Sequence, residues 1–99
     1  MSADPHAALR DRVITRVLDG EGETQPSLRQ AVANRQGTPA DLKALVEKIH
    51  LHAYKVTDDD IARAQAKYGD DQMFEIVVSS ALGAARSRLV AGLKALDEA

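Results

Sequence analysis

The chain contains no cysteine and no tryptophan, and its aromatic rings other than histidine are one phenylalanine and two tyrosines. Without cysteine there can be no disulfide bond, no thiolate metal site and no cysteine nucleophile. Because 44% of the residues are hydrophobic and so few of these are aromatic, the core is left to Leu, Val, Ile and Ala. These absences exclude thiol chemistry and predict a modest aliphatic core.

The sequence also lacks a basic block and a long apolar run. Its 13 lysines and arginines are scattered among 15 acidic residues, for a net charge of -2, which argues against a nucleic-acid partner. No segment has about eighteen consecutive apolar residues, and residues 1–13 lack the apolar centre of a signal peptide. We therefore expect a cytoplasmic protein with neither a nucleic-acid nor a membrane partner.

The length predicts one domain over residues 1–99. A chain of this size buries only about two-thirds of its unfolded surface, so association with further copies would add needed burial. Three prolines and most glycines fall where helices should begin and end, and no strand-like alternation interrupts them. The fold class expected is an all-α, single-domain bundle of five helices.

Residues 1–37 predict two N-terminal helices. Asp4 and Pro5 have the residue types of an N-cap and first helical position, and the first helix should end near "DGEGET". Pro26 should begin the second helix, and Gly37 should stop it. Their expected apolar faces are Leu9, Val13, Ile14, Val17 and Leu18 in the first helix, and Leu28, Ala31 and Val32 in the second.

Residues 38–99 predict three further helices. The third should start with Thr38 as N-cap and Pro39 at the first position, with Asp41 completing an acidic capping box. Thr57 should cap a fourth helix that ends at Gly69. The third helix is expected to carry one apolar stripe formed by Leu42, Leu45, Val46, Ile49, Ala53 and Val56.

The fifth helix is predicted from Gln72 to about Leu96. At 1.5 Å per residue it is about 37 Å long, which is more than a domain of this size needs to cover its own core, so we expect part of it to meet another subunit. Its "SSALGAA" segment is small on nearly every face, which suits tight packing within the chain and an interface equally. The apolar side expected for this helix consists of Phe74, Val77, Val78, Ala81, Ala85, Leu89, Val90, Leu93 and Leu96.

The stretch "IHLHAYKVTDDDI", residues 49–61, gathers the candidate chemistry. His50 and His52 project about 160° apart on a regular helix, so they cannot bind one metal ion together, and no metal site is expected. Each lies at an edge of the apolar stripe. Each is therefore either a core-edge side chain bonded to backbone or a general base, whose ordinary pKa near 6.5 would suit proton transfer.

Other residues near this joint are candidates for binding. Tyr54 and Thr57 could line a pocket, and Lys55 or Arg63 could hold a substrate carboxylate. The three consecutive aspartates at residues 58–60 point in three directions and are explained as acids at a helix N-terminus. No phosphate-binding loop or hydrolase motif is present, and we expect no cofactor.

From Leu42 onward, "LKALVEKIHLHAYKVTDDDIARAQAKYGDDQMFEIVVSSALGAARSRLVAGL" resembles the helical core of the carboxymuconolactone decarboxylase and alkylhydroperoxidase D-like superfamily. The resemblance rests on the apolar helix, the second helix ending in Gly69, the acidic cap, the "DQMFEIVVSSALGAA" helix with Glu75, and the following "RLVAGLKAL". It implies an all-α fold that commonly assembles as trimers or hexamers, with residues 38–99 as the family-like core.

The resemblance also shows what this chain lacks. Aligned on Gly69, the two cysteines of the peroxidase branch fall at Tyr54 and Thr57, and the histidine that both branches keep falls at Ile61. The thiol chemistry of that branch is therefore absent.

Two hypotheses follow. The first is a non-peroxidatic binding or scaffold subunit that associates with itself, with a small-molecule ligand as a further candidate partner. The alternative is a cofactor-independent lyase or isomerase acting on a small carboxylated substrate, with His50 or His52 as base. An accessory subunit that docks on a larger enzyme through its fifth helix is a third reading.

Overall fold

A computed structural model describes residues 7–98 and shows an all-helical protein, with no strand in that part of the chain. The all-α, five-helix expectation is therefore confirmed. The predicted cap at Asp4 and Pro5 lies outside the described residues. The helices are α1 (Ala7–Asp19), α2 (Pro26–Asn34), α3 (Ala40–Leu51), α4 (Asp58–Gln65) and α5 (Asp70–Glu98), with a 3₁₀ turn η1 (Ala53–Lys55) between α3 and α4.

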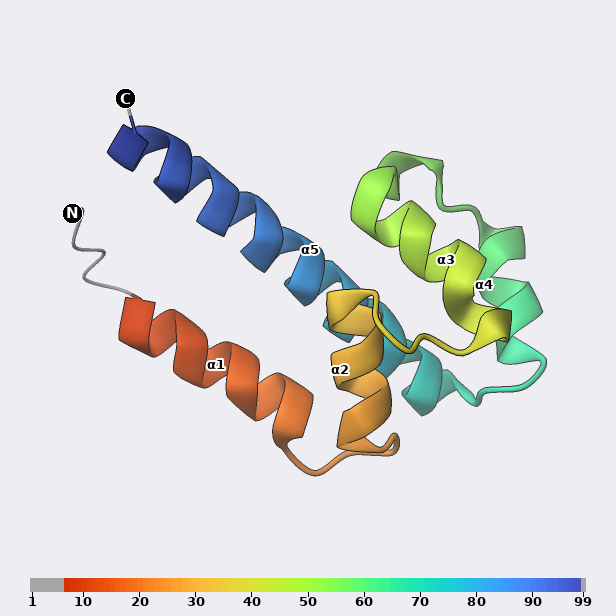
Figure 1. Ribbon diagram of the computed structural model, residues 1–99. Coiled ribbons are helices and arrows are strands. Elements are labelled where there is room, and N and C mark those ends of the chain that lie inside the picture. The colour runs from red at the N-terminus through yellow and green to blue at the C-terminus, as the bar shows by residue number, and fades with distance from the viewer. Residues whose placement is uncertain (1–6, 99) are drawn as a thin grey trace.

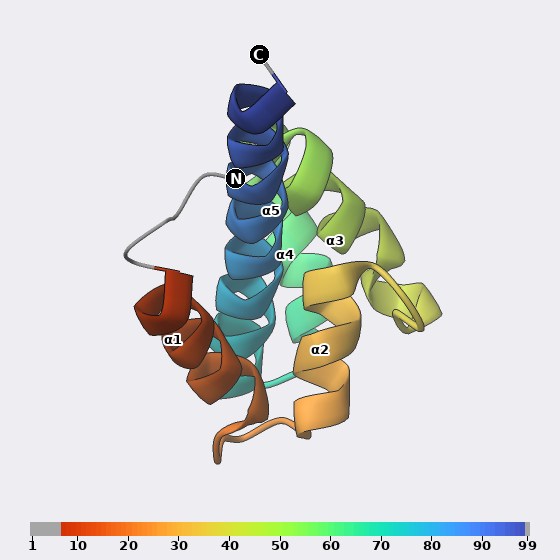
Figure 2. The same cartoon turned by 60° about the vertical axis from the view of Figure 1, so that its left-hand side comes forward.

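Helix α5 is the central helix, and the other helices pack against it (Figure 1). Its 29 residues run most of the length of the molecule, whose longest extent is 47 Å. Figure 2 shows α1 on one side of α5, with α2 and α3 on the other. The C-terminal half of α5 extends beyond α2, so it is covered less than the N-terminal half.

The core is aliphatic, as its composition requires. A larger cluster joins α2, α3, α4 and α5, and a smaller one joins α1 and α2. Burying one such Leu, Ile or Val stabilises the fold by about 1.5–3 kcal/mol relative to leaving it exposed. The larger cluster consists of Val32, Leu42, Leu45, Val46, Ile49, Ala64, Met73 and Ile76, and the smaller one of Ile14, Leu18 and Ala33.

The ends of α2 and α4 follow local rules. Pro26 opens α2, and Arg35 closes it in the left-handed conformation at φ 55°, followed by Gly37 at φ 70°. Helix α4 ends at Gln65, about one turn before the predicted Gly69. The N–H groups of Lys67 and Tyr68 both donate to the carbonyl of Ala64, which tightens the chain into a turn there.

The predicted capping box at the start of the third helix was wrong. The N-cap is Pro39 and the helix begins at Ala40. The Thr38 hydroxyl instead donates to the Ala31 carbonyl at 3.3 Å, which ties the loop to the end of α2. Asp41 turns to α4, where it accepts from the Tyr68 hydroxyl at 3.3 Å and pairs with Lys67 at 3.1 Å.

The third helix is also shorter than its apolar stripe predicted. It ends at Leu51, and His52 leaves the helical region at φ -146° and ψ 56°. A continuous helix would use the His50 carbonyl to accept from the N–H of Tyr54. In the structure Arg88 of α5 donates to that carbonyl, so a tertiary contact replaces the helical bond where the helix stops.

The face that α5 buries differs from the predicted one. Phe74, Leu89 and Leu96 of the predicted apolar side are 70%, 43% and 73% exposed. Most of the face that packs on the domain is small, and it consists of Met73, Ile76, Ser79, Ser80, Gly83 and Ala84. Helix α2 needs this arrangement because it approaches the α5 backbone closely, and only small side chains leave room for it.

Candidate functional site

The joint between α3 and α4 separates the two candidate histidines. His50 remains in α3 and is buried, whereas His52 lies after the helix and is exposed. The Nε2 atom of His50 lies 2.9 Å from the carbonyl oxygen of Val32 in α2. Burial lowers the pKa of His50 below its ordinary 6.5, and the nearby Arg35 and Arg88 charges act in the same direction. The ring is therefore neutral at pH 7, with Nε2–H donating to Val32.

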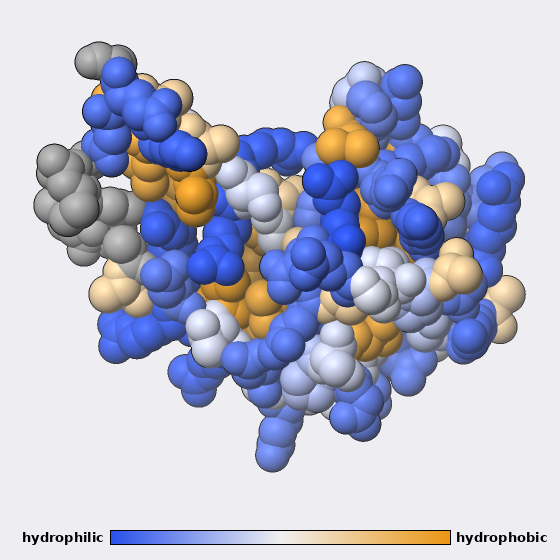
Figure 3. All heavy atoms as spheres, viewed as in Figure 1, coloured by the Kyte–Doolittle hydropathy of each residue, from blue (hydrophilic) through white to orange (hydrophobic). Residues whose placement is uncertain are grey.

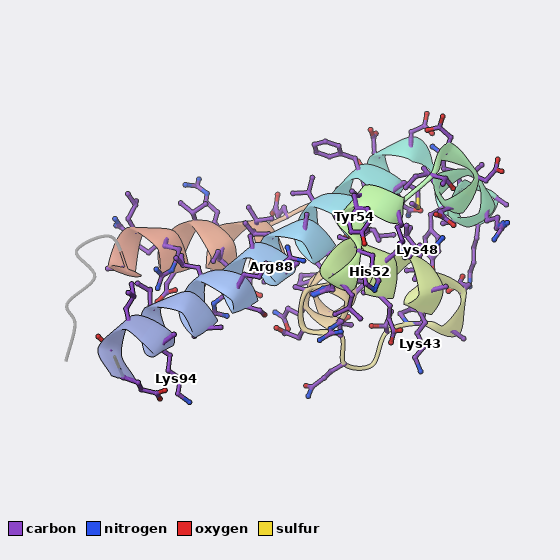
Figure 4. The ribbon with its side chains drawn as sticks, turned by 90° about the horizontal axis from the view of Figure 1, so that it is seen from above. Lys43, Lys48, His52, Tyr54, Arg88 and Lys94 are labelled. Carbon is purple, nitrogen blue, oxygen red and sulfur yellow. The ribbon has the colours of Figure 1, made fainter. Side chains whose placement is uncertain are left out.

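His52 belongs to an exposed aromatic and cationic group on η1 (Figure 4). Its ring meets that of Tyr54 edge to face, with centroids 6.0 Å apart and planes at 87°. The Lys55 ammonium lies 5.8 Å from the centre of the Tyr54 ring. Tyr54 is 81% exposed, so this group stands on the surface and does not enclose a substrate.

Thr57 is a helix cap, as predicted. Its hydroxyl accepts from the N–H of Asp60 at 3.2 Å, and the Asp60 carboxylate accepts from the N–H of Thr57 at 2.9 Å. Lys48 of α3 donates to the same carboxylate at 2.9 Å. The Thr57 N–H bond, followed by the Lys48 bond, lowers the pKa of Asp60 to about 2. The cap is thereby joined to α3.

The structure brings together only His52, Tyr54 and Lys55 of the predicted site residues. Arg63 lies on the exposed side of α4, and within residues 7–98 no hydrogen bond or ion pair joins it to either histidine. Neither histidine, nor Tyr54, Lys55, Thr57 or Arg63, lines any of the five hollows described for this part of the chain. Ile61 packs against the larger core cluster.

A buried polar cluster that the sequence analysis missed lies at the other end of the molecule. Arg29 of α2 is only 3% exposed and donates to the carbonyls of Val17, at 2.6 Å, and Gly20. These are the free carbonyls at the end of α1, so Arg29 caps that helix from outside. Its place on the apolar side of α2, three residues before Val32, was the signal that could have identified it.

Glu75 of α5 completes this cluster. Its carboxylate accepts from the Thr24 hydroxyl at 2.7 Å, the Thr24 N–H at 2.9 Å and the Glu23 N–H at 2.6 Å. The hydroxyl bond is the main reason that the pKa of Glu75 is lowered from 4.5. The Nε atom of Arg29 lies 4.0 Å away. Glu75 therefore holds the loop between α1 and α2 in place, since the three hydrogen bonds that its carboxylate accepts all come from this loop.

Two hollows on the surface are of interest. One, of about 570 Å³, opens beside α2 and the start of α5 and is lined by polar groups including Gln25, Ser27, Tyr68 and Gln72. The other, of about 280 Å³, is an apolar groove between α1 and α5. The described residues contain no group of three or more His, Asp or Glu side chains placed to hold a metal ion.

Helix α5 is also long and apolar enough to cross a membrane by length and composition alone, and 28% of its most apolar window is buried in the molecule. Core helices of soluble proteins meet the same criterion, so this is weak evidence.

No family model, curated protein or solved structure matches this chain. Its function is therefore argued from its own residues.

Proposed function

We propose that this protein is a non-peroxidatic member of the carboxymuconolactone decarboxylase and alkylhydroperoxidase D-like superfamily, and that it acts as a self-associating binding or scaffold subunit. The resemblance of residues 42–93 supports the family, and these residues span α3 to most of α5. The absence of cysteine supports the lack of peroxidase activity. Tyr54, Thr57 and Ile61 replace the family's reactive residues with an exposed ring, a helix cap and a core side chain.

The observation that carries the proposal is the outer face of α5, which we define as Phe74, Val78, Ala81, Leu82, Ala85, Leu89, Gly92 and Leu96. These residues follow an 11-residue spacing that keeps them on one side of a straight helix, opposite the buried face. The outer face carries no charge, and a strip one helix wide along α5 covers on the order of 400 Å². An uncharged face of this kind marks an interaction site.

Helix α1 widens this apolar surface. Leu9 and Val13, one turn apart, are 54% and 50% exposed. Figure 3 shows hydrophobic residues over the C-terminal half of α5 and in the hollow between it and α1. Association of copies would bury both helices, in a closed assembly such as the trimer or hexamer that the family resemblance implies.

A cytoplasmic location is part of the proposal. Arg86 and Arg88 lie in the C-terminal half of α5, and a charged residue at the centre of a membrane helix costs about 2.5–3.5 kcal/mol. An interface between copies accommodates both arginines at its rim. The hollow of about 570 Å³ beside α2 has the size of a small-ligand site and supports a binding role without a cofactor.

The enzymatic alternative has less geometric support. The Nε2 atom of His50 is committed to Val32, and His52 stands on an exposed turn without a surrounding pocket. A general base needs to reach its substrate in a site that excludes water.

Size-exclusion chromatography with light scattering tests the proposal. We expect a closed oligomer at micromolar concentration and no turnover of hydroperoxides above the rate in free solution. A monomer at every concentration would contradict self-association, and peroxidase turnover would contradict the non-peroxidatic assignment. A third result, a monomer that binds a larger enzyme, would assign the outer face of α5 to a different partner.

A further inference from the structure

The apolar groove between α1 and α5 is large enough to accept an apolar side chain. Val13 of α1 and Leu82, Ala85 and Leu89 of α5 line it, with Arg10 and Arg86 at its margin. Its volume is about 280 Å³, and three of its lining residues belong to the outer face of α5. The groove therefore lies on the same surface that the proposed assembly would bury.

Phe74 lies on this surface too. It is the single phenylalanine of the chain and is 70% exposed near the start of α5. Position 85 follows it by eleven residues, which is close to three full turns, so Phe74 and the groove share one face about 16 Å apart. A phenylalanine cannot reach the groove of its own chain from there, because both are fixed on one rigid helix.

The charges along α5 fit a second copy in the opposite direction. Asp70 and Asp71 form the first turn, just before Phe74, whereas Arg86 lines the groove and Arg88 comes two residues later. If two α5 helices pack antiparallel about a point beside Ala81, residues 70–71 of each copy lie opposite residues 91–92 of the other, about one turn beyond Arg88. A parallel arrangement would place acid beside acid and arginine beside arginine.

We propose that Phe74 of one copy inserts into the groove between α1 and α5 of a second copy, and that the second copy does the same in return. The contact is a two-fold, isologous interface of the kind that a hexamer with two-fold axes contains and a trimer does not, and it rests on the self-association proposed above. Its axis passes beside Ala81, because residues 74 and 85–89 then face each other across it. The small Ala81 side chain lets the two helices approach closely there.

The outer face of α5 is by itself too small for a stable pair of copies. The outer face of α5 offers on the order of 400 Å², and a stable interface buries about 800 Å² per partner, so α5 alone is insufficient. In this arrangement Leu9 and Val13 of α1 flank the inserted ring and supply further area. An anionic lipid surface fits less well, because Asp70 and Asp71 beside Phe74 would be repelled by it.

Complementation between two variants tests the insertion. Phe74→Ala removes the inserted ring and Ala85→Trp fills the groove, so each variant alone should lose at least tenfold in self-association. An equimolar mixture should recover part of it, because the ring of the Ala85→Trp copy still meets an intact groove in the Phe74→Ala copy. Analytical ultracentrifugation measures the association, and circular dichroism confirms that each variant is folded.

Leu51→Ala is the matched control, since Leu51 is 52% exposed at the end of α3 and belongs neither to the outer face of α5 nor to the groove. It should associate like the unchanged protein. The natural absence of cysteine allows a second measurement: Ala81→Cys should form a disulfide-linked dimer under mild oxidation, whereas Leu96→Cys and Phe74→Cys should not.

Each other outcome overturns the inference in a distinguishable way. If Phe74→Ala associates normally, the scaffold proposal stands and the Phe74 contact is wrong. If Phe74→Cys links to itself, the helices are parallel. If the unchanged protein is monomeric, both proposals fail, and binding of that monomer to anionic vesicles through Phe74 would assign the surface to lipid.

Discussion

Gly83 of α5 lies so close to Ala33 of α2 that a methyl group at position 83 would stand 2.1 Å from the Ala33 carbonyl oxygen. No real side-chain carbon tolerates that distance, so α2 sits directly on the α5 backbone. The neighbouring Ser79, Ser80 and Ala84 are buried in the same region. The sequence suited the "SSALGAA" segment equally to packing within the chain and to an interface between copies. Its buried residues at positions 79, 80, 83 and 84 pack within the chain.

Substitution of Gly83 by alanine should therefore destabilise the protein. Alanine favours a helix by about 1 kcal/mol over glycine. Forcing α2 away from α5 outweighs this gain, and we expect a net loss of about 1–3 kcal/mol in the free energy of unfolding. Gly92→Ala is the matched control, because no atom lies within 4 Å of its added carbon. Urea unfolding of both variants measures the difference, and equal stabilities would refute the close contact.

Glu75→Gln should loosen the loop between α1 and α2. The carboxylate accepts three hydrogen bonds there, and a bond to a charged group contributes about 1.5–3 kcal/mol. Since the folded-state pKa is lowered from 4.5, this contribution is complete above about pH 4.5 and disappears as the pH falls through the lowered pKa. Unfolding measured from pH 7 to pH 3 should show a smaller acid loss for the variant. Glu47→Gln, at an exposed position of α3, should behave like the unchanged protein.

Thr57→Ala should weaken the start of α4. Loss of the side-chain acceptor for the Asp60 N–H costs about 1 kcal/mol at a typical N-cap. Thr57→Ser keeps the hydroxyl and should retain most of the stability. Thermal unfolding separates the two variants, and an alanine variant as stable as the serine variant would show that the cap contributes nothing.

His50 should make the protein sensitive to mild acid. The pKa of His50 is lowered from 6.5, mainly by burial, so the unfolded chain binds its proton more readily than the folded one. The stability from this site is fully present above about pH 6.5 and is lost as the pH falls through the lowered folded pKa. His50→Gln should remove this part of the pH dependence. An NMR titration that places the His50 pKa above 6.5 would contradict the burial argument.

Local patterns predicted several features correctly. Pro26 began α2, and Thr57 with its aspartates began α4, because caps involve residues within one turn of each other. The end of α2 was predicted less well, since Arg35 closes it two residues before Gly37. Patterns spread along the chain did less well. The apolar stripe ending at Val56 predicted one continuous α3. The spacing of apolar residues contains no information about Arg88, 38 residues away, which donates to the His50 carbonyl where the helix ends.

The same limit applies to α5 and to the candidate site. Helix α5 has an apolar face and a face of small residues, and only the approach of α2 to Gly83 decides which one is buried. Sequence spacing put His50 and His52 on opposite edges of one helix, whereas the fold buries the first against Val32 and exposes the second. Arg29 and Glu75 take up their structural roles only where α1, α2 and α5 meet.

Composition and local spacing were thus enough for the all-helical class, the exclusion of thiol chemistry and the helix caps, because these depend on residue chemistry and on neighbours within a turn. The buried state of His50, the role of Glu75 and the exposed outer face of α5 depend on contacts between residues 18 to 52 positions apart. Such contacts form only when the helices pack, since their partners share no local hydrogen-bonding pattern. For that reason the tertiary structure alone decided which residues serve the fold and which surface remains for a partner.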